Sequence, residues 1–145
     1  MPDSKKPKFP VVSGEYAMTS EWIISLPGAF KRRIEEGSLV LWRPGLTAWI
    51  DVWGNDQRKS KRARLRRIRA DSSPQRFDEI EEKEGGLLRY AYRLEEPASD
   101  DRAAALYCFA VGGSGHVQMA AHFDDETEAE AALALWRGLR EHGEI

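Results

Sequence analysis

The stretch from Ser38 to Gly54, SLVLWRPGLTAWIDVWG, constrains the fold of this chain more than any other. Two runs rich in β-branched and aromatic residues flank Pro44-Gly45, and the stretch holds three of the chain's five tryptophans. Such runs favour strands, and a Pro-Gly pair favours a turn between them. The stretch therefore predicts a β-hairpin in the centre of a sheet. Its apolar side chains need further strands and helices to cover them.

The length of the hairpin loop decides which side chains share a face of the sheet. A two-residue loop puts the apolar side chains on one face and a mixture of aromatic and polar side chains on the other. The apolar set is Leu39, Leu41, Ala48, Ile50 and Val52, and the mixed set is Val40, Trp42, Thr47, Trp49, Asp51 and Trp53. A loop of odd length exchanges this pairing between the strands. It is a real alternative, because tight hairpins favour turns with a twist opposite to that of an L-Pro-Gly type II turn.

Composition places the chain among globular proteins, with 145 residues, 41% hydrophobic and 32% charged. This length suits one domain. The net charge of -2 gives no global reason to expect nucleic acid or an anionic membrane as a partner. Cys108 is the only cysteine, which excludes an intramolecular disulfide and favours the cytoplasm. No apolar run approaches the roughly 20 residues that span a bilayer, and the basic N-terminus lacks the apolar region of a secretory signal.

The rest of the chain predicts more strands around the hairpin. Residues 1–19 show no regular period and predict a flexible arm, followed by one domain over 20–145. A first strand is expected over 21–26, ended by Pro27-Gly28, with a polar connection or short helical turn over 30–36. Further strands are expected over 88–94, 106–111 and 116–123, the last two joined by Gly112-Gly113-Ser114-Gly115.

Two segments predict helices. Eight of the twelve residues from Arg58 to Arg69 are basic, and the apolar ones predict a narrow buried stripe: Ala63, Leu65 and Ile68. The acidic segment 77–86 carries the opposite charge, so the two are expected to lie against each other. A C-terminal helix is predicted to begin at the N-cap Asp125 and to end at the C-cap Gly143. Its buried stripe is Ala132, Leu135, Trp136 and Leu139.

These elements predict an α+β fold, an antiparallel sheet of five to seven strands covered by two or three helices. Over residues 20–142 their order resembles the PsbP-like superfamily. The resemblance lies in WIISLPGAFKRR, the SLVLW and LTAWIDVW hairpin, the basic middle helix and the helix after Asp124-Asp125. That superfamily includes Ran-binding nucleotide-release factors, photosystem PsbP proteins and bacterial domains, some of them chaperones of secreted effectors. The resemblance implies a curved sheet used for binding more often than for chemistry, without a shared catalytic residue set.

The candidate site is the mixed sheet face. It carries aromatic and arginine side chains, which dominate protein-binding hot spots. Its expected members, if the strands stack in register, are Trp42, Trp49, Asp51, Trp53, Arg89, Arg93, His116, Gln118 and His122. The alternative is that a helix covers the tryptophans and that the arginines are only solvated.

Other motifs favour structural roles. The basic run lacks the aromatics that stack on bases and is followed at once by acidic residues, so solvated or paired charge is expected. His116 and His122 are six residues apart on one strand, roughly 20 Å, too far for one metal ion. The glycine-rich turn lacks the Lys and Ser/Thr of a phosphate loop. Cys108 lies between Tyr107 and Phe109, where a buried, inert thiol is expected.

No catalytic motif is present, so the chain is expected to be a cytoplasmic protein-binding module without cofactor or metal: an adaptor, an effector chaperone or an immunity-type protein. One alternative is a small-ligand binder or enzyme with a pocket on the same face, where His122, Asp51 and Arg93 converge. Another is a nucleic-acid accessory protein that uses the basic helix. A homodimer through the mixed face is a further alternative.

Overall fold

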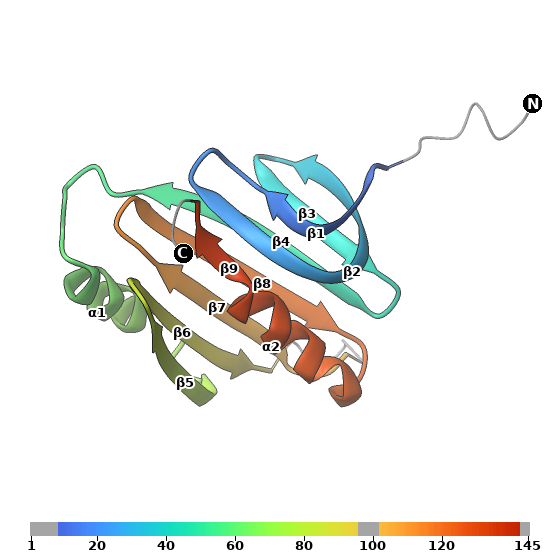
Figure 1. Cartoon of the computed structure of the whole chain (residues 1–145). Helices are drawn as coiled ribbons and strands as arrows, with labels where there is room; N and C mark the ends of the chain where they lie inside the picture. Colours follow the sequence, from blue (N-terminus) through green and yellow to red (C-terminus); the bar gives the residue numbers. More distant parts are fainter. Residues whose placement is uncertain (1–8, 96–101, 143–145) are drawn as a thin grey trace, which may run out of the picture.

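A computed structural model describes residues 9–95 and 102–142, and within them it forms one nine-stranded antiparallel sheet with two α-helices (Figure 1). The α+β class and the antiparallel sheet are confirmed, but five to seven strands were too few. The elements are β1 (Val11–Ala17), β2 (Trp22–Glu35), β3 (Ser38–Arg43), β4 (Leu46–Gly54), α1 (Lys61–Asp71), β5 (Phe77–Glu84), β6 (Leu87–Leu94), β7 (Ala105–Val111), β8 (Gly115–Phe123), the 3-10 turn η2 (Glu126–Glu128), α2 (Ala129–Arg137) and β9 (Leu139–Glu141).

The sheet consists of two meanders joined along one seam. The strand order is β1-β2-β3-β4-β8-β7-β6-β5, so β4 pairs with β8 where the two halves meet. The short strand β9 returns across the molecule and pairs with the start of β2. Figure 1 shows α1 beside the β5–β6 end and α2 crossing the face of the sheet in front of β7 and β8.

The central hairpin has the two-residue loop and hence the predicted faces. Arg43 pairs with Leu46, and Gly45 has a φ of 84°, a left-handed conformation that glycine adopts without strain. On the apolar face, Leu41 and its partner Ala48 are fully buried. The expected division of the hairpin into an apolar and a mixed face is therefore confirmed.

Each face of the sheet has its own core. On one face, α2 buries Trp136 against Trp22 and the apolar side of the central strands. On the other, α1 buries Leu65 against a second cluster: Leu88, Tyr90, Tyr92, Phe109 and Val111. The predicted basic helix is thus confirmed; the Ser60 side chain caps it by accepting a bond from the Ala63 amide, 3.1 Å long. Its charges meet the acidic strand as expected, because Arg62 and Arg69 both bridge Glu81 at 2.8 Å.

The N-terminal predictions need correction. Residues 1–8 lie outside the described part, but a flexible arm is wrong from Val11 onward, because β1 pairs with β2. Strand β2 does not end at Pro27-Gly28. Its pairing with β1 continues on both sides of these residues, and the register shifts there, because Val12 lies opposite Phe30 and Gly14 opposite Leu26. Residues 30–35 belong to strand β2 and are not a connection. Glu36 and Gly37 then form a two-residue turn with φ of 50° and 88°, and Glu35 pairs with Ser38 across it.

The C-terminal helix is shorter than predicted. Asp125 caps η2, α2 then ends at Arg137, and Gly138 is its C-cap. The chain turns there into β9, where Leu139 is buried as expected but as part of a strand. A Cβ on Gly138 would lie 2.7 Å from the Ser25 carbonyl oxygen, which shows how closely the chain passes β2 at this turn. The predicted C-cap Gly143 lies outside the described residues.

Candidate functional site

Neither α1 nor α2 packs its apolar side on the mixed face of β3, β4 and β8, and Arg64 of α1 reaches only the end of this face, at Gly115. Helix α1 packs on β6 and β7, and α2 packs on the opposite face. The strand register places the candidate side chains side by side on this face, because Trp49 is opposite Ala120, Asp51 opposite Gln118, and Trp53 opposite His116. We call this surface the open face. Its members are Trp42, Thr47, Trp49, Asp51, Trp53, His116, Gln118, Ala120 and His122.

An arginine orders the tryptophans at one end of the open face. The Arg33 guanidinium lies 4.7 Å from the ring centroid of Trp42 and 5.6 Å from that of Trp49. Glu35 holds the same guanidinium at 2.7 Å. A guanidinium over an aromatic face is attracted by the ring quadrupole, so Arg33 helps to hold both tryptophan rings in place. Sequence reasoning missed Arg33 because segment 30–36 was not expected to be a strand; the Glu36-Gly37 turn was the available signal.

The other end of the open face exposes an aromatic ring. Trp53 is 53% exposed and stacks on His116, with ring centroids 6.3 Å apart and planes at 15°. Burial, and then the positive charge of Arg64, lower the pKa of His116 below its ordinary value. The ring is therefore neutral at neutral pH and stacks as a flat, weakly polar surface.

The middle of the open face is polar and carries one small side chain. Asp51 accepts a hydrogen bond of 2.6 Å from the Ser38 hydroxyl. Ala120 stands between two large aromatic neighbours, since it pairs with Trp49 on one side and Tyr107 on the other. The small side chain of Ala120 therefore lies between two larger ones in this row of the sheet.

The two predicted arginines of β6 do not belong to this face. Arg89 pairs with Ala110 and Arg93 with Leu106, which puts both on the α2 side of the sheet. Both faces of β6 are covered by other parts of the chain. The polar side chains that alternate with apolar ones along this strand therefore face α2 and not solvent. Consequently the expected convergence of His122, Asp51 and Arg93 is wrong.

Both arginines have structural partners instead. Arg89 is 2% exposed and donates to Glu84 at 2.6 Å and to the carbonyl oxygens of Arg137 and Leu139 at 3.2 Å. Arg93 donates to the carbonyl oxygen of Ala104. Its guanidinium also bridges the Glu126 carboxylate at 2.6 Å.

The glycine-rich turn holds a carboxylate of its own chain. It joins β7 to β8 as predicted, and the amides of Gly113 and Ser114 donate to Glu141 of β9, at 3.2 Å and 2.8 Å. The Ser114 hydroxyl donates to the same carboxylate. From the other side, Arg64 donates to the carbonyl oxygens of Gly112 and Gly115. The turn thus fastens β9 and α1 to the sheet.

The hydrogen bonds between Glu141 and the glycine-rich turn depend on pH. Burial opposes the ionisation of Glu141, but hydrogen bonds from Ser114 and Gly113 outweigh burial and lower the pKa below 4.5. Because the pKa of Glu141 is lower in the folded than in the unfolded chain, ionised Glu141 stabilises the fold above about pH 4.5 and loses this contribution as the pH falls further.

We expect Glu141→Gln to unfold more easily than wild type at pH 7 and the difference to shrink by pH 3, measured by urea titration. The exposed Glu95→Gln serves as control, and a pH-independent difference would contradict this role.

The remaining candidate groups have structural surroundings. His116 and His122 share a face, and no group of three or more His, Cys, Asp or Glu residues in the described ranges could hold a metal ion. Cys108 is fully buried, which raises the pKa of its thiol well above the ordinary value. In the basic run, Arg62, Arg64, Arg67 and Arg69 bind groups of this chain.

Comparisons with protein families, curated proteins and solved structures found no match for this chain. Neither of the two helices in residues 9–95 and 102–142 is long and apolar enough to cross a membrane.

Proposed function

We propose that this chain is a protein-binding module whose partner docks on the open face. One observation carries the proposal: three tryptophans gather on a sheet face that neither helix covers, and Trp53 is 53% exposed. Large aromatic groups in water are unfavourable unless a partner covers them, and tryptophan with arginine is the combination most enriched in interface hot spots. The Arg33–Trp42–Trp49 layer is already ordered, so little side-chain freedom is lost on binding.

The chemistry of the open face specifies the kind of partner. The aromatic side chains of Trp49 and Trp53 offer apolar contact, and Asp51 and Gln118 between them offer hydrogen bonds to a polypeptide. Four of the five arginines of α1 already bind groups of this chain, which weighs against nucleic acid. An adaptor, an effector chaperone or an immunity-type protein fits these properties, and the PsbP-like resemblance supports a binding role over an enzymatic one. We place the chain in the cytoplasm because of its single cysteine.

Acrylamide quenching of tryptophan fluorescence tests whether the open face is free. Trp53→Phe is expected to remove the most quenchable component, whereas the buried Trp22→Phe, as the matched control, is expected to leave it. Light scattering at several concentrations is run beside it. Protection of all five tryptophans in a dimer would assign the face to a second copy of the chain and overturn the proposal of a different partner.

A site-specific crosslink identifies the partner. A photoreactive phenylalanine analogue at Gln118 on the open face is compared with one at Glu130, which is exposed on α2. We expect a discrete adduct with another protein from position 118 alone, and its loss when Trp49→Ala is added. Equal labelling from both positions, or an adduct that survives Trp49→Ala, would contradict the open face as the docking site.

A further inference from the structure

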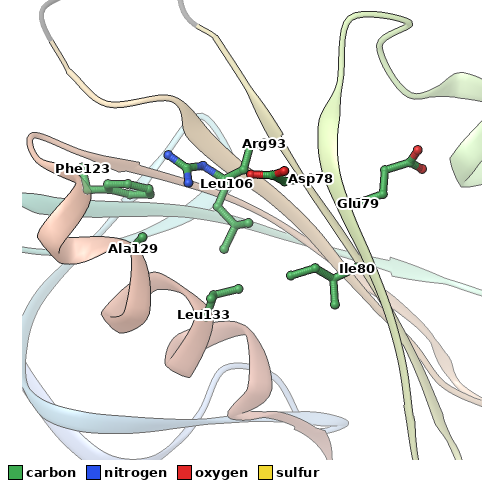
Figure 2. Close-up of a pocket in the computed structure, with 8 residues that line it drawn as sticks. All are labelled: Asp78, Glu79, Ile80, Arg93, Leu106, Phe123, Ala129 and Leu133. Carbon is green, nitrogen blue, oxygen red and sulfur yellow. The ribbon is translucent and has the colours of Figure 1, made fainter.

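A concave site lies on the side of the sheet opposite the open face, between α2 and the edge strand β5. It is a slot of about 340 Å³, within the range of roughly 300–1,000 Å³ that ligand pockets occupy. Ile80 of β5 and Leu133 of α2 point toward each other across it (Figure 2). Leu106, Phe123 and Ala129 complete its apolar walls.

Two ion pairs tie α2 and the turn before it to the β5–β6 hairpin. At the beginning of the helical segment Glu126 bridges Arg93 at 2.6 Å, and at its end Arg137 bridges Glu82 at 2.7 Å. Helix α2 itself packs on β2, β7 and β8. The side of the helix that carries Ala129 and Leu133 therefore faces β5 across the slot, and the apolar walls are accessible between the two bridges.

Strand β5 supplies an unbalanced negative charge to this slot. It contains five carboxylates, and four of them have a guanidinium partner: Glu79 with Arg76, Glu81 with Arg62, Glu82 with Arg137 and Glu84 with Arg89. Asp78 is the exception among the described residues, with neither an ion pair nor a hydrogen bond. The cation at the slot, Arg93, is already balanced by Glu126.

A β-bulge turns Asp78 toward the slot. Phe77 pairs with Arg93 and Ile80 with Ala91, so Asp78 and Glu79 together stand opposite one residue. The two carboxylates separate as a result: Glu79 accepts a bond of 2.6 Å from the Tyr90 hydroxyl on the α1 side. Asp78 has a φ of 52° and lies beside Arg93 and Leu106, while Glu79 points away (Figure 2). Bulges commonly re-aim side chains in this way beside binding sites.

We propose that this slot binds a small amphipathic organic cation, with its apolar body between Ile80 and Leu133 and its ammonium group on Asp78. The apolar walls provide the affinity, and the unpaired carboxylate at the rim selects the charge. Asp78 is exposed, so its charge is not fully desolvated, and a charge-assisted hydrogen bond there is worth about tenfold in affinity. This site is separate from the open face and does not depend on the function proposed for it.

Three probes of similar shape test the charge preference on the full chain. Binding of 2-phenylethylamine, 2-phenylethanol and 3-phenylpropanoate is followed by amide shifts in ¹H–¹⁵N NMR spectra. We expect the amine to bind about tenfold more tightly than the alcohol, the carboxylate to bind least, and the shifts to centre on Ile80 and Leu133. Equal affinity of amine and alcohol, tighter binding of the carboxylate, or the absence of shifts at these residues would overturn the proposal.

Variants test the same site independently. Asp78→Asn keeps the shape and tolerates a positive φ, so the amine is expected to bind it about as weakly as the alcohol binds wild type. Asp56→Asn, at another exposed aspartate, is expected to leave the affinity for the amine unchanged.

Ala129→Leu fills the slot and is expected to abolish binding of amine and alcohol, whereas Ala134→Leu on the exposed side of α2 is expected to preserve it. Retained amine binding in Ala129→Leu would contradict the slot as the site.

Discussion

Gly115→Ala is expected to destabilise the protein by about 3 kcal/mol or more, among the larger effects of a single methyl group. A Cβ at position 115 would lie 1.9 Å from the carbonyl oxygen of Trp53 and 2.9 Å from its carbonyl carbon. Both atoms belong to the backbone of β4, so no side-chain rotation relieves the clash. The end of β4 must separate from β8, and the Arg64 bond to the Gly115 carbonyl is disturbed with it. Urea unfolding followed by fluorescence measures the loss.

Gly113→Ala is the matched control, because it adds the same methyl group in the same turn. No atom lies within 4 Å of a Cβ at position 113, and the site is exposed. We expect a change within about 0.5 kcal/mol. If both variants lost the same stability, flexibility of the turn and not the contact with Trp53 would be the reason for glycine at position 115.

Arg89→Met is expected to cost about 3 kcal/mol of unfolding free energy. Methionine nearly preserves the volume, so the loss reports the polar contacts and not a cavity. Arg89 is 2% exposed and donates to two carbonyl oxygens, those of Arg137 and Leu139, where α2 turns into β9. Net values of about 1–1.5 kcal/mol per hydrogen bond, together with the cost of acceptors left without a donor, give this magnitude. The same urea titration measures it.

Two further variants separate the possible causes of that loss. Arg66→Met changes an exposed arginine of α1 and is expected to alter stability by less than about 0.5 kcal/mol. Glu84→Gln removes the charged partner of Arg89, but the Glu84 side chain is 74% exposed, so a smaller loss than in Arg89→Met is expected. A loss in Glu84→Gln equal to that in Arg89→Met would show that the ion pair, and not the carbonyl contacts, stabilises this junction.

Features encoded by local chemistry could be predicted from the sequence. The Pro44-Gly45 turn fixes the register of the central hairpin, and with it the face that carries Trp49, Asp51 and Trp53. The basic helix likewise follows from the N-cap Ser60 and the spacing of Leu65 and its neighbours. In both cases the deciding interactions lie within a few residues of each other, so a pattern in the sequence reports them directly.

Features decided by partners far away in the chain could not be predicted. Strand β5 has the sequence FDEIEEKE, which has little preference for a strand; its pairing with β6 and the arginines of α1 and α2 make it one. Strand β9 exists because β2 offers Trp22–Ile24 as a partner. The alternation in β6 predicts the wrong face for Arg89 and Arg93, because it implies that one side of the strand is solvated, whereas both faces of β6 are covered.

The seam between β4 and β8 has a consequence for how the chain reaches this structure. Each meander is built from neighbours in sequence, whereas the seam joins Leu46 to Phe123 across more than half of the chain. Closing so long a loop costs more entropy than forming any local hairpin, so the seam belongs late in assembly. Until it closes, β4 and β8 are unpaired central edges that carry their hydrophobic side chains into solvent. Two chains at high concentration can then complete each other's sheets, and the segment 55–60 between the meanders is the hinge about which such an exchange of halves takes place.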